Sequence, residues 1–210
     1  MRKLVLSTGN KNKVKEIKEI LKDMPIQILT KDEVGLADLE VVEDGTTLEY
    51  NSLKKARAIS NLVDAIVMAD DSGLFVDSLN GDPGVYSSRY GGEDGNDALN
   101  NKVLLKNLQG KDRQATFKSV IAFITEDKKE YTVYGECKGN ILEEADGDNG
   151  FGYDPIFSPE GYEDSFASMP IDIKNSISHR KRALDRFREK LLKIVGEKNK
   201  RNILIKMLVL

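Results

Sequence analysis

The order of strand-like and helical segments constrains the fold of this 210-residue chain more than any other feature of its sequence. In the first half, short apolar runs at residues 3–7, 26–29 and 65–69 alternate with segments of helical periodicity. In the second half, strand-like segments at residues 115–126 and 130–136 flank a polar turn, which predicts an antiparallel hairpin. This combination predicts an α/β fold with a mixed β-sheet, flanking helices and two lobes.

The helices are identified by apolar spacing and by their capping residues. Val14, Ile17 and Leu21 recur at helical spacing, which predicts a helix over residues 11–23. The same criteria predict helices from the cap at residue 47 to about residue 61, at residues 93–108 and at residues 178–195.

The chain shows no internal division. It contains no repeat, low-complexity tract or long linker, so we expect one domain of two lobes spanning residues 1–210. Residues 196–210, which end in the apolar stretch ILIKMLVL, form a tail to which the sequence assigns no role.

The composition excludes several classes of protein. The single Cys137 cannot form an internal disulfide, and the single His179 excludes a His-rich zinc site, so any bound metal must be held by oxygen atoms. The apolar stretches are far shorter than the ~20 residues that span a bilayer, and the N-terminal segment has too few apolar residues for a signal peptide. A net charge of −3 and a pI near 5.4 argue against a stable nucleic-acid partner. We expect a cytoplasmic protein with no membrane partner.

The charge is distributed unevenly along the chain. From Lys174 onward, 12 lysines and arginines face only three acidic residues, whereas the preceding 173 residues are strongly acidic. An acidic body with a basic C-terminal segment can hold a cation and a polyanion in one cleft. The alternative is a basic helix that is simply solvated.

The turn at residues 7–13, STGNKNK, is the first candidate site. It joins a strand to a helix, and a helix N-terminus with lysines and small polar side chains suits a bound anion. The GxxxxGK[ST] pattern of a P-loop is absent, and an ordinary strand-to-helix connection is the alternative.

Two adjacent carboxylates, Asp70 and Asp71, form the second candidate because they follow the apolar strand at residues 65–69 directly. In open α/β sheets, ligands bind beyond the carboxyl ends of strands. Side chains alternate along a strand, so at most one of the two is expected to face a cleft, and a purely structural cap is the alternative. Glu43 can supply a second oxygen ligand, and Mg²⁺ needs only one or two protein carboxylates.

The third and fourth candidates lie in the C-terminal third of the chain. In the loop GFGYDP, Phe151 or Tyr153 can stack on a flat ligand and Asp154 can accept a hydrogen bond from it, although such aromatics usually pack between lobes. Donor side chains at the start of the last helix come from Lys174, His179 and Arg180.

Five segments in this order resemble the inosine triphosphate pyrophosphatase family: STGNKNKVKEI, EDGTTLEYNSLKKA, MADDSGLFVDSLNGDPGVYSSRYGGED, NGFGYDPIF and KNSISHRKRAL. The resemblance covers residues 3–195. It implies an elongated mixed sheet with two lobes enclosing a substrate cleft, and a homodimer. It also implies Mg²⁺-dependent hydrolysis of inosine, deoxyinosine and xanthosine triphosphates to the monophosphate and pyrophosphate.

The resemblance also implies residue roles. Asp71 would accept the proton and, with Glu43, bind the metal. Ser72 would contact the substrate. The triphosphate would be held by Thr8, Gly9, Asn10, Lys11, Asn12 and Lys13, and the base by Phe151, Gly152, Tyr153, Asp154, Lys174, His179 and Arg180.

One departure from the family pattern lies in the second segment, where Tyr50 replaces an acidic residue that the family commonly has. This removes a carboxylate expected near the metal, for which Asp70 or water can substitute. A nucleotide-binding module that does not hydrolyse its ligand is therefore one alternative. A pyrophosphatase of modified pyrimidine or bulky nucleotides, similar to the septum-related enzymes, is another, but the FGYDP and SHR motifs argue against it.

Overall fold

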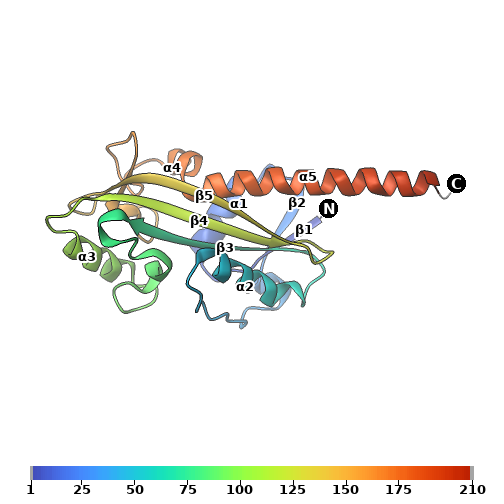
Figure 1. Ribbon diagram of the computed structural model, residues 1–210, viewed down its shortest axis with the longest axis horizontal. Helices are drawn as coiled ribbons and strands as arrows, with labels where there is room; N and C mark the ends of the chain where they lie inside the picture. The colour runs from blue at the N-terminus through green and yellow to red at the C-terminus, as the bar shows by residue number, and fades with distance from the viewer. Residues whose placement is uncertain (1, 209–210) are drawn as a thin grey trace.

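The computed structural model of the chain describes the backbone of residues 2–208 and the side chains of residues 2–196. Within these residues, six strands form one mixed sheet in the order β2-β1-β3-β4-β5-β6 (Figure 1). The β2-β1-β3 part is parallel and the remaining pairs are antiparallel, which confirms the predicted mixed α/β sheet. The strands are β1 (Arg2–Leu6), β2 (Ile26–Thr30), β3 (Ile66–Val76), β4 (Gln114–Ile124), β5 (Glu130–Ile141) and β6 (Phe157–Pro159).

Helices cover both faces of this sheet (Figure 1). The sequence of β1 is apolar without alternation because both faces of the strand are buried. Leu4 and Leu6 pack with Phe187 on one face, and Val5 packs with Ile59 on the other. The helices are α1 (Lys11–Ile20), α2 (Leu48–Ser60), α3 (Asp97–Asn107), α4 (Ile171–Ile177) and α5 (His179–Leu208), with 3₁₀ helices η1 (Asp32–Val34), η2 (Asp77–Leu79), η3 (Gly84–Arg89) and η4 (Asp154–Ile156).

Helix α5 begins where the sequence predicts, with the Ser178 hydroxyl accepting a hydrogen bond from the Lys181 amide at 3.2 Å. It continues to Leu208, well past the predicted end at residue 195, and its last turns project beyond the sheet (Figure 1). The side chains of the apolar tail lie outside the described residues. Among the helices described here, none combines the length and apolarity that crossing a membrane requires.

The prediction that the third strand ends before Asp70 is wrong, because β3 runs on to Val76. Its pairing with β1 stops at Met68, opposite Leu6, but its antiparallel pairing with β4 continues as far as Val76. The two aspartates therefore lie inside β3, just beyond the carboxyl end of β1. The general rule for ligand position still applies, but the strand that ends at the site is β1.

Candidate active site

A cleft of about 560 Å³ opens between the turn after β1, the middle of β3, the loop before η4 and the start of α5. Two of the predicted site residues, Lys11 and Asn12, are exposed on the first turn of α1 and do not line this cleft. The other predicted site residues all line the cleft: Thr8, Gly9, Asn10, Lys13, Glu43, Asp71, Ser72, Phe151, Gly152, Tyr153, Asp154, Lys174, His179 and Arg180.

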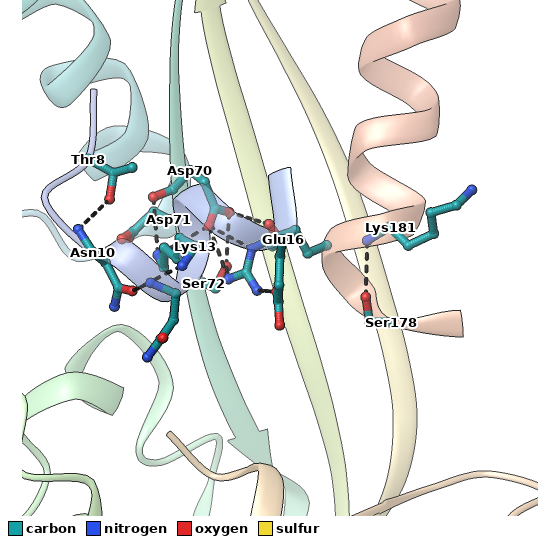
Figure 2. Close-up of polar contacts among 12 residues, drawn as sticks. Thr8, Asn10, Lys13, Glu16, Asp70, Asp71, Ser72, Ser178 and Lys181 are labelled. Atoms are coloured by element: carbon teal, nitrogen blue, oxygen red, sulfur yellow. Dashed lines mark hydrogen bonds and ion pairs between the residues drawn. The ribbon is translucent and has the colours of Figure 1, made fainter. Parts of the chain in front are cut away.

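The turn after β1 is shaped by its own side chains. The Asn10 carboxamide caps α1 by accepting hydrogen bonds from the Asn12 and Lys13 amides at 3.0 Å, and Thr8 Oγ1 accepts from the Asn10 amide at 3.2 Å (Figure 2). The side chain of Lys13 lies toward β3, with its Nζ 3.2 Å from Asp70 Oδ2 (Figure 2). The turn thus brings a cap and a lysine to the carboxyl end of β1.

The two aspartates of β3 have opposite environments, as expected from strand alternation. Asp70 is buried behind the cleft, where Oδ2 pairs with Arg180 at 3.1 Å and Oδ1 accepts from the Ser119 hydroxyl at 2.5 Å. Burial opposes ionisation of Asp70, but Arg180 and Lys13 outweigh it and hold its pKa well below the usual range. Asp70 is therefore a structural anion, and it does not line the cleft in the way a substitute metal ligand must.

Asp71 lines the cleft and shares one cation with Glu43. Lys55 Nζ donates to Asp71 Oδ1 at 2.8 Å and to Glu43 Oε2 at 2.9 Å, so the two carboxylates converge on one point. Burial raises the pKa of Asp71 to about 6. Lys55 acts against this rise, and Glu43 adds to it. In Glu43, the positive charge of Lys55 outweighs the effect of burial and lowers the pKa. The result is a pair of carboxylates of unequal basicity facing the cleft.

At the other end of the cleft, the predicted donors are already held by acidic groups. Lys174 Nζ lies 2.7 Å from both Glu16 Oε1 and Asp154 Oδ2, and Arg180 Nη1 lies 2.5 Å from Glu16 Oε2. Both cations also lie over the ring of Phe151, at 5.2 Å and 5.6 Å from its centroid. Phe151 therefore borders a rigid, charged end of the cleft.

His179 and Tyr153 are more deeply buried than the half-buried Phe151. His179 stacks on Phe117 with 4.6 Å between ring centroids, and burial lowers its pKa well below the ordinary value, so it is neutral. Its Nδ1 is buried and has no hydrogen-bond partner among the described residues. Tyr153 packs in the core and donates a hydrogen bond from its hydroxyl to the Ser87 carbonyl at 2.9 Å. It therefore follows the alternative given for this aromatic, packing within the protein, and not stacking on a ligand.

A sequence profile of the Ham1 family matches residues 4–190 of the chain. The chain belongs to the Ham1 family. The dITP/XTP pyrophosphatase of Clostridium perfringens is 49% identical over 200 residues, which cover 91% of this chain and 98% of that protein. The dITP/XTP pyrophosphatase of Clostridium tetani is 46% identical, over 94% of this chain and all of the relative. The resemblance predicted from the five sequence segments is confirmed.

The structure of a HAM1 protein from Coxiella burnetii superposes with a TM-score of 0.83 at 35% identity, covering 92% of this chain and all of the other. The Ham1 protein of Staphylococcus aureus gives a TM-score of 0.81 at 34% identity, over 91% of this chain and 99% of that one. Both agree with the mixed sheet described above.

Tyr50, where this Ham1 chain departs from the family pattern, is not among the residues that line the described cleft. Tyr50 is 52% exposed, and its ring packs so closely on Gly45 that a Cβ there would overlap it. The neighbouring Asn51 is buried and accepts a hydrogen bond from the Gly45 amide at 2.8 Å. Asn51 and the ring of Tyr50 thus both contact Gly45, two residues after Glu43 in the same loop.

Three residues that line the cleft, and Glu16 behind it, were not predicted from the sequence of the Ham1 chain. Lys55 and Glu16 lie on the buried faces of α2 and α1, and a charged residue within an apolar helix stripe was the available signal. Lys31, which follows β2, and Arg89, the last residue of η3, line the cleft and donate to the carbonyls of Leu39 and Glu43, at 3.0 Å and 3.1 Å. Arg89 lies within the third of the five resembling segments but no role was assigned to it, and Lys31 lies outside all five.

Proposed function

We propose that this Ham1 protein hydrolyses inosine, deoxyinosine and xanthosine triphosphates to the monophosphate and pyrophosphate, with Mg²⁺ as cofactor. The observation that carries the proposal is that one cleft joins the Asp71–Lys55–Glu43 group to the end bordered by Phe151, Lys174 and Arg180. The first group suits a phosphate chain and the second suits a purine. The names and the 46–49% identity of the clostridial relatives support the same reaction.

The residues present fit a magnesium ion. Glu43 and Asp71 converge on the ammonium group of Lys55, so a positive charge is already accommodated between these two hard oxygen ligands. The described residues contain no group of three or more His, Cys, Asp and Glu suited to a metal. Two carboxylates suffice because Mg²⁺ usually keeps several waters and binds the phosphates of the substrate. When bound, Mg²⁺ supplies positive charge that stabilises the phosphate oxygens.

The side chains of the cleft supply the remaining parts of the reaction. A water oxygen adds to the α-phosphorus, the bond from that phosphorus to the bridging oxygen breaks, and pyrophosphate leaves. Asp71 takes the proton of the water, because its carboxylate lines the cleft beside Glu43 and Lys55. Lys55 and Lys13 carry positive charge at the same end of the cleft and bind the phosphates.

Selection among purines takes place at the end of the cleft near Phe151. The ring stacks on the base, and the donors Lys174, His179 and Arg180 face the 6-oxo group. An adenine places an amine against these donors, so the hydrogen bonds that a 6-oxo group accepts from them are not made, which costs binding free energy. Salt bridges to Glu16 hold Lys174 and Arg180 in place, so they cannot turn away from the wrong base.

The proposal includes a homodimer located in the cytoplasm. The family resemblance supports the dimer. A single, buried cysteine supports a reducing compartment, where structural disulfides are rare.

The decisive experiment incubates the purified protein with Mg²⁺ and, separately, with inosine, xanthosine, adenosine and guanosine triphosphates, and then quantifies pyrophosphate and orthophosphate. We expect pyrophosphate from the inosine and xanthosine substrates, and its loss in EDTA. Equal rates on all four substrates would contradict the specificity, and orthophosphate as the direct product would contradict the reaction. Tight binding of inosine triphosphate without hydrolysis would identify a nucleotide-binding module instead.

A further inference from the structure

Helix α3 holds Gly152, in the base-side loop, through both its backbone N–H and its backbone C=O. The Gly152 amide donates to Asp97 Oδ2 at 2.7 Å, and the Gly152 carbonyl accepts from Asn101 Nδ2 at 3.1 Å. Asp97 and Asn101 are four residues apart, so they lie on the same face of the helix. They are separated from Gly152 by 55 and 51 positions in the chain. The two contacts together form a clamp, which we call the Gly152 clamp.

The clamp acts on a segment that has little support from regular backbone pairing. Gly150 and Gly152 have φ values of +79° and +63°, in the left-handed region. Phe151 lies between them, and its amide donates to Asp154 Oδ2 at 2.7 Å. The position of the Phe151 ring is therefore set from two sides, by Asp154 within the loop and by the Gly152 clamp from α3.

Helix α3 is itself fixed to the neighbouring wall of the cleft. The Asn100 side chain accepts from the Gly91 amide at 2.6 Å and donates to the Ser88 carbonyl at 2.9 Å. Ser88 and Asp97 both line the cleft. The first turns of α3 thus connect η3 and the Phe151 loop, and they provide a rigid reference for the base end.

We propose that Asp97 and Asn101 are positioning residues that set the depth of Phe151 in the cleft, and thereby the discrimination between 6-oxo and 6-amino purines. This inference rests on the proposed function, because it takes Phe151 to contact the base. Stacking and donor alignment depend on displacements of well under 1 Å, so a loop freed from α3 binds the preferred base less well. Asp71, Glu43 and Lys55 make their contacts elsewhere and keep their geometry.

The test compares Asp97→Ala and Asn101→Ala with the conservative Asp97→Asn, whose amide oxygen still accepts from the Gly152 amide. We expect each alanine variant to raise KM for inosine triphosphate about tenfold, which corresponds to about 1.4 kcal/mol, with kcat within about twofold of the wild type. The ratio of kcat/KM for inosine over adenosine triphosphate falls. Asp97→Asn restores most of both quantities. The matched control is Asn107→Ala, which removes a 3.0 Å hydrogen bond from the same helix to Tyr90 and leaves KM unchanged.

Phe151→Ala distinguishes failure of the clamp from failure of the proposed function. If Phe151→Ala raises KM and lowers the ratio but Asp97→Ala and Asn101→Ala do not, the clamp has no positioning role. If Phe151→Ala changes neither quantity, the base does not bind at this end and both ideas are wrong. A fall in kcat at constant KM in both alanine variants also overturns the inference. If Asp97→Ala fails to fold in a thermal scan, Asn101→Ala decides the outcome.

Discussion

Substitution of the two adjacent aspartates of β3 should affect different properties, stability for Asp70 and catalysis for Asp71. Asp70→Asn and Asp71→Asn make the same chemical change one residue apart, but the two side chains lie on opposite sides of the strand. Asp70 pairs with Arg180 and Lys13 away from solvent, whereas Asp71 lines the cleft. We therefore expect Asp70→Asn to lower the free energy of unfolding, and Asp71→Asn to lower kcat without loss of stability.

The expected loss of stability in Asp70→Asn arises because the substitution leaves the positive charges of Arg180 and Lys13 without their carboxylate partner. The Asp70 side chain is wholly buried, as is Arg180, and neither Arg180 nor Lys13 has another carboxylate that replaces Asp70 fully. Removing one partner of a buried ion pair typically costs about 3–5 kcal/mol. For a chain of this size, that corresponds to a fall in Tm of roughly 6–20 °C.

The expected gain in the free energy of unfolding of Asp71→Asn follows from the pKa of the carboxyl group that is replaced. A rise from 3.8 to about 6 means that the folded state disfavours the ionised form by about 3 kcal/mol. A neutral amide avoids this cost, and Lys55 keeps Glu43 as a partner. The stability of Asp71→Asn should therefore equal that of the wild type or exceed it by up to about 3 kcal/mol, while kcat falls at least ~10²-fold.

Urea denaturation at pH 7.5 in EDTA measures both free energies without a divalent ion, and a separate pyrophosphate assay with Mg²⁺ measures kcat. The wild type and Asn107→Ala serve as references. Equal destabilisation by the two substitutions, or a larger loss in Asp71→Asn, would refute the assignment of Asp70 as the structural anion. Near-normal turnover in Asp71→Asn would remove Asp71 from the mechanism.

Three further predictions concern other parts of the site. Because burial keeps His179 neutral in the fold, the unfolded chain alone binds its proton below pH 6.5, so His179 lowers the free energy of unfolding as pH falls, by up to about 1.4 kcal/mol per unit. Asp71 has the opposite effect below pH 6, so the urea midpoints of the wild type must be compared with those of His179→Gln, which should lose this contribution. Gly135→Ala should lower the urea midpoint by the equivalent of about 1–3 kcal/mol, because its Cβ would overlap the first turn of α5. Lys31→Ala and Arg89→Ala should raise KM for inosine and adenosine triphosphates alike, because Lys31 lies near Gly9 and Arg89 binds the Glu43 carbonyl, at the phosphate end of the cleft. A changed ratio between the substrates would contradict this.

The sequence was sufficient to predict those site residues that follow local rules. Thr8 and Asn10 belong to a strand-to-helix turn whose capping chemistry is written in neighbouring residues. Asp71 follows an apolar run, and alternation along a strand correctly predicted that only one of two adjacent carboxylates faces the cleft. The predicted strand end was wrong because the pairing partner of residues 70–76 is β4, 39 to 51 positions later in the chain, and no local pattern reveals that partner.

Glu16 and Lys55 carry a local signal, a charge on the buried face of a helix, that is too weak to identify them by itself. A charged residue on a helix normally faces solvent. Glu16 can be buried because it pairs with Lys174 and Arg180, which lie 158 and 164 positions later in the chain. These ion pairs explain why the charge is distributed unevenly along the chain. The basic segment inserts Lys174 and Arg180 into the acidic body, where Glu16, Asp70 and Asp154 neutralise them. Docking of α5 against β4, β5 and α1, together with α4, which carries Lys174, therefore completes the core and assembles the base end of the cleft in the same step, so substitutions that loosen this contact should impair both.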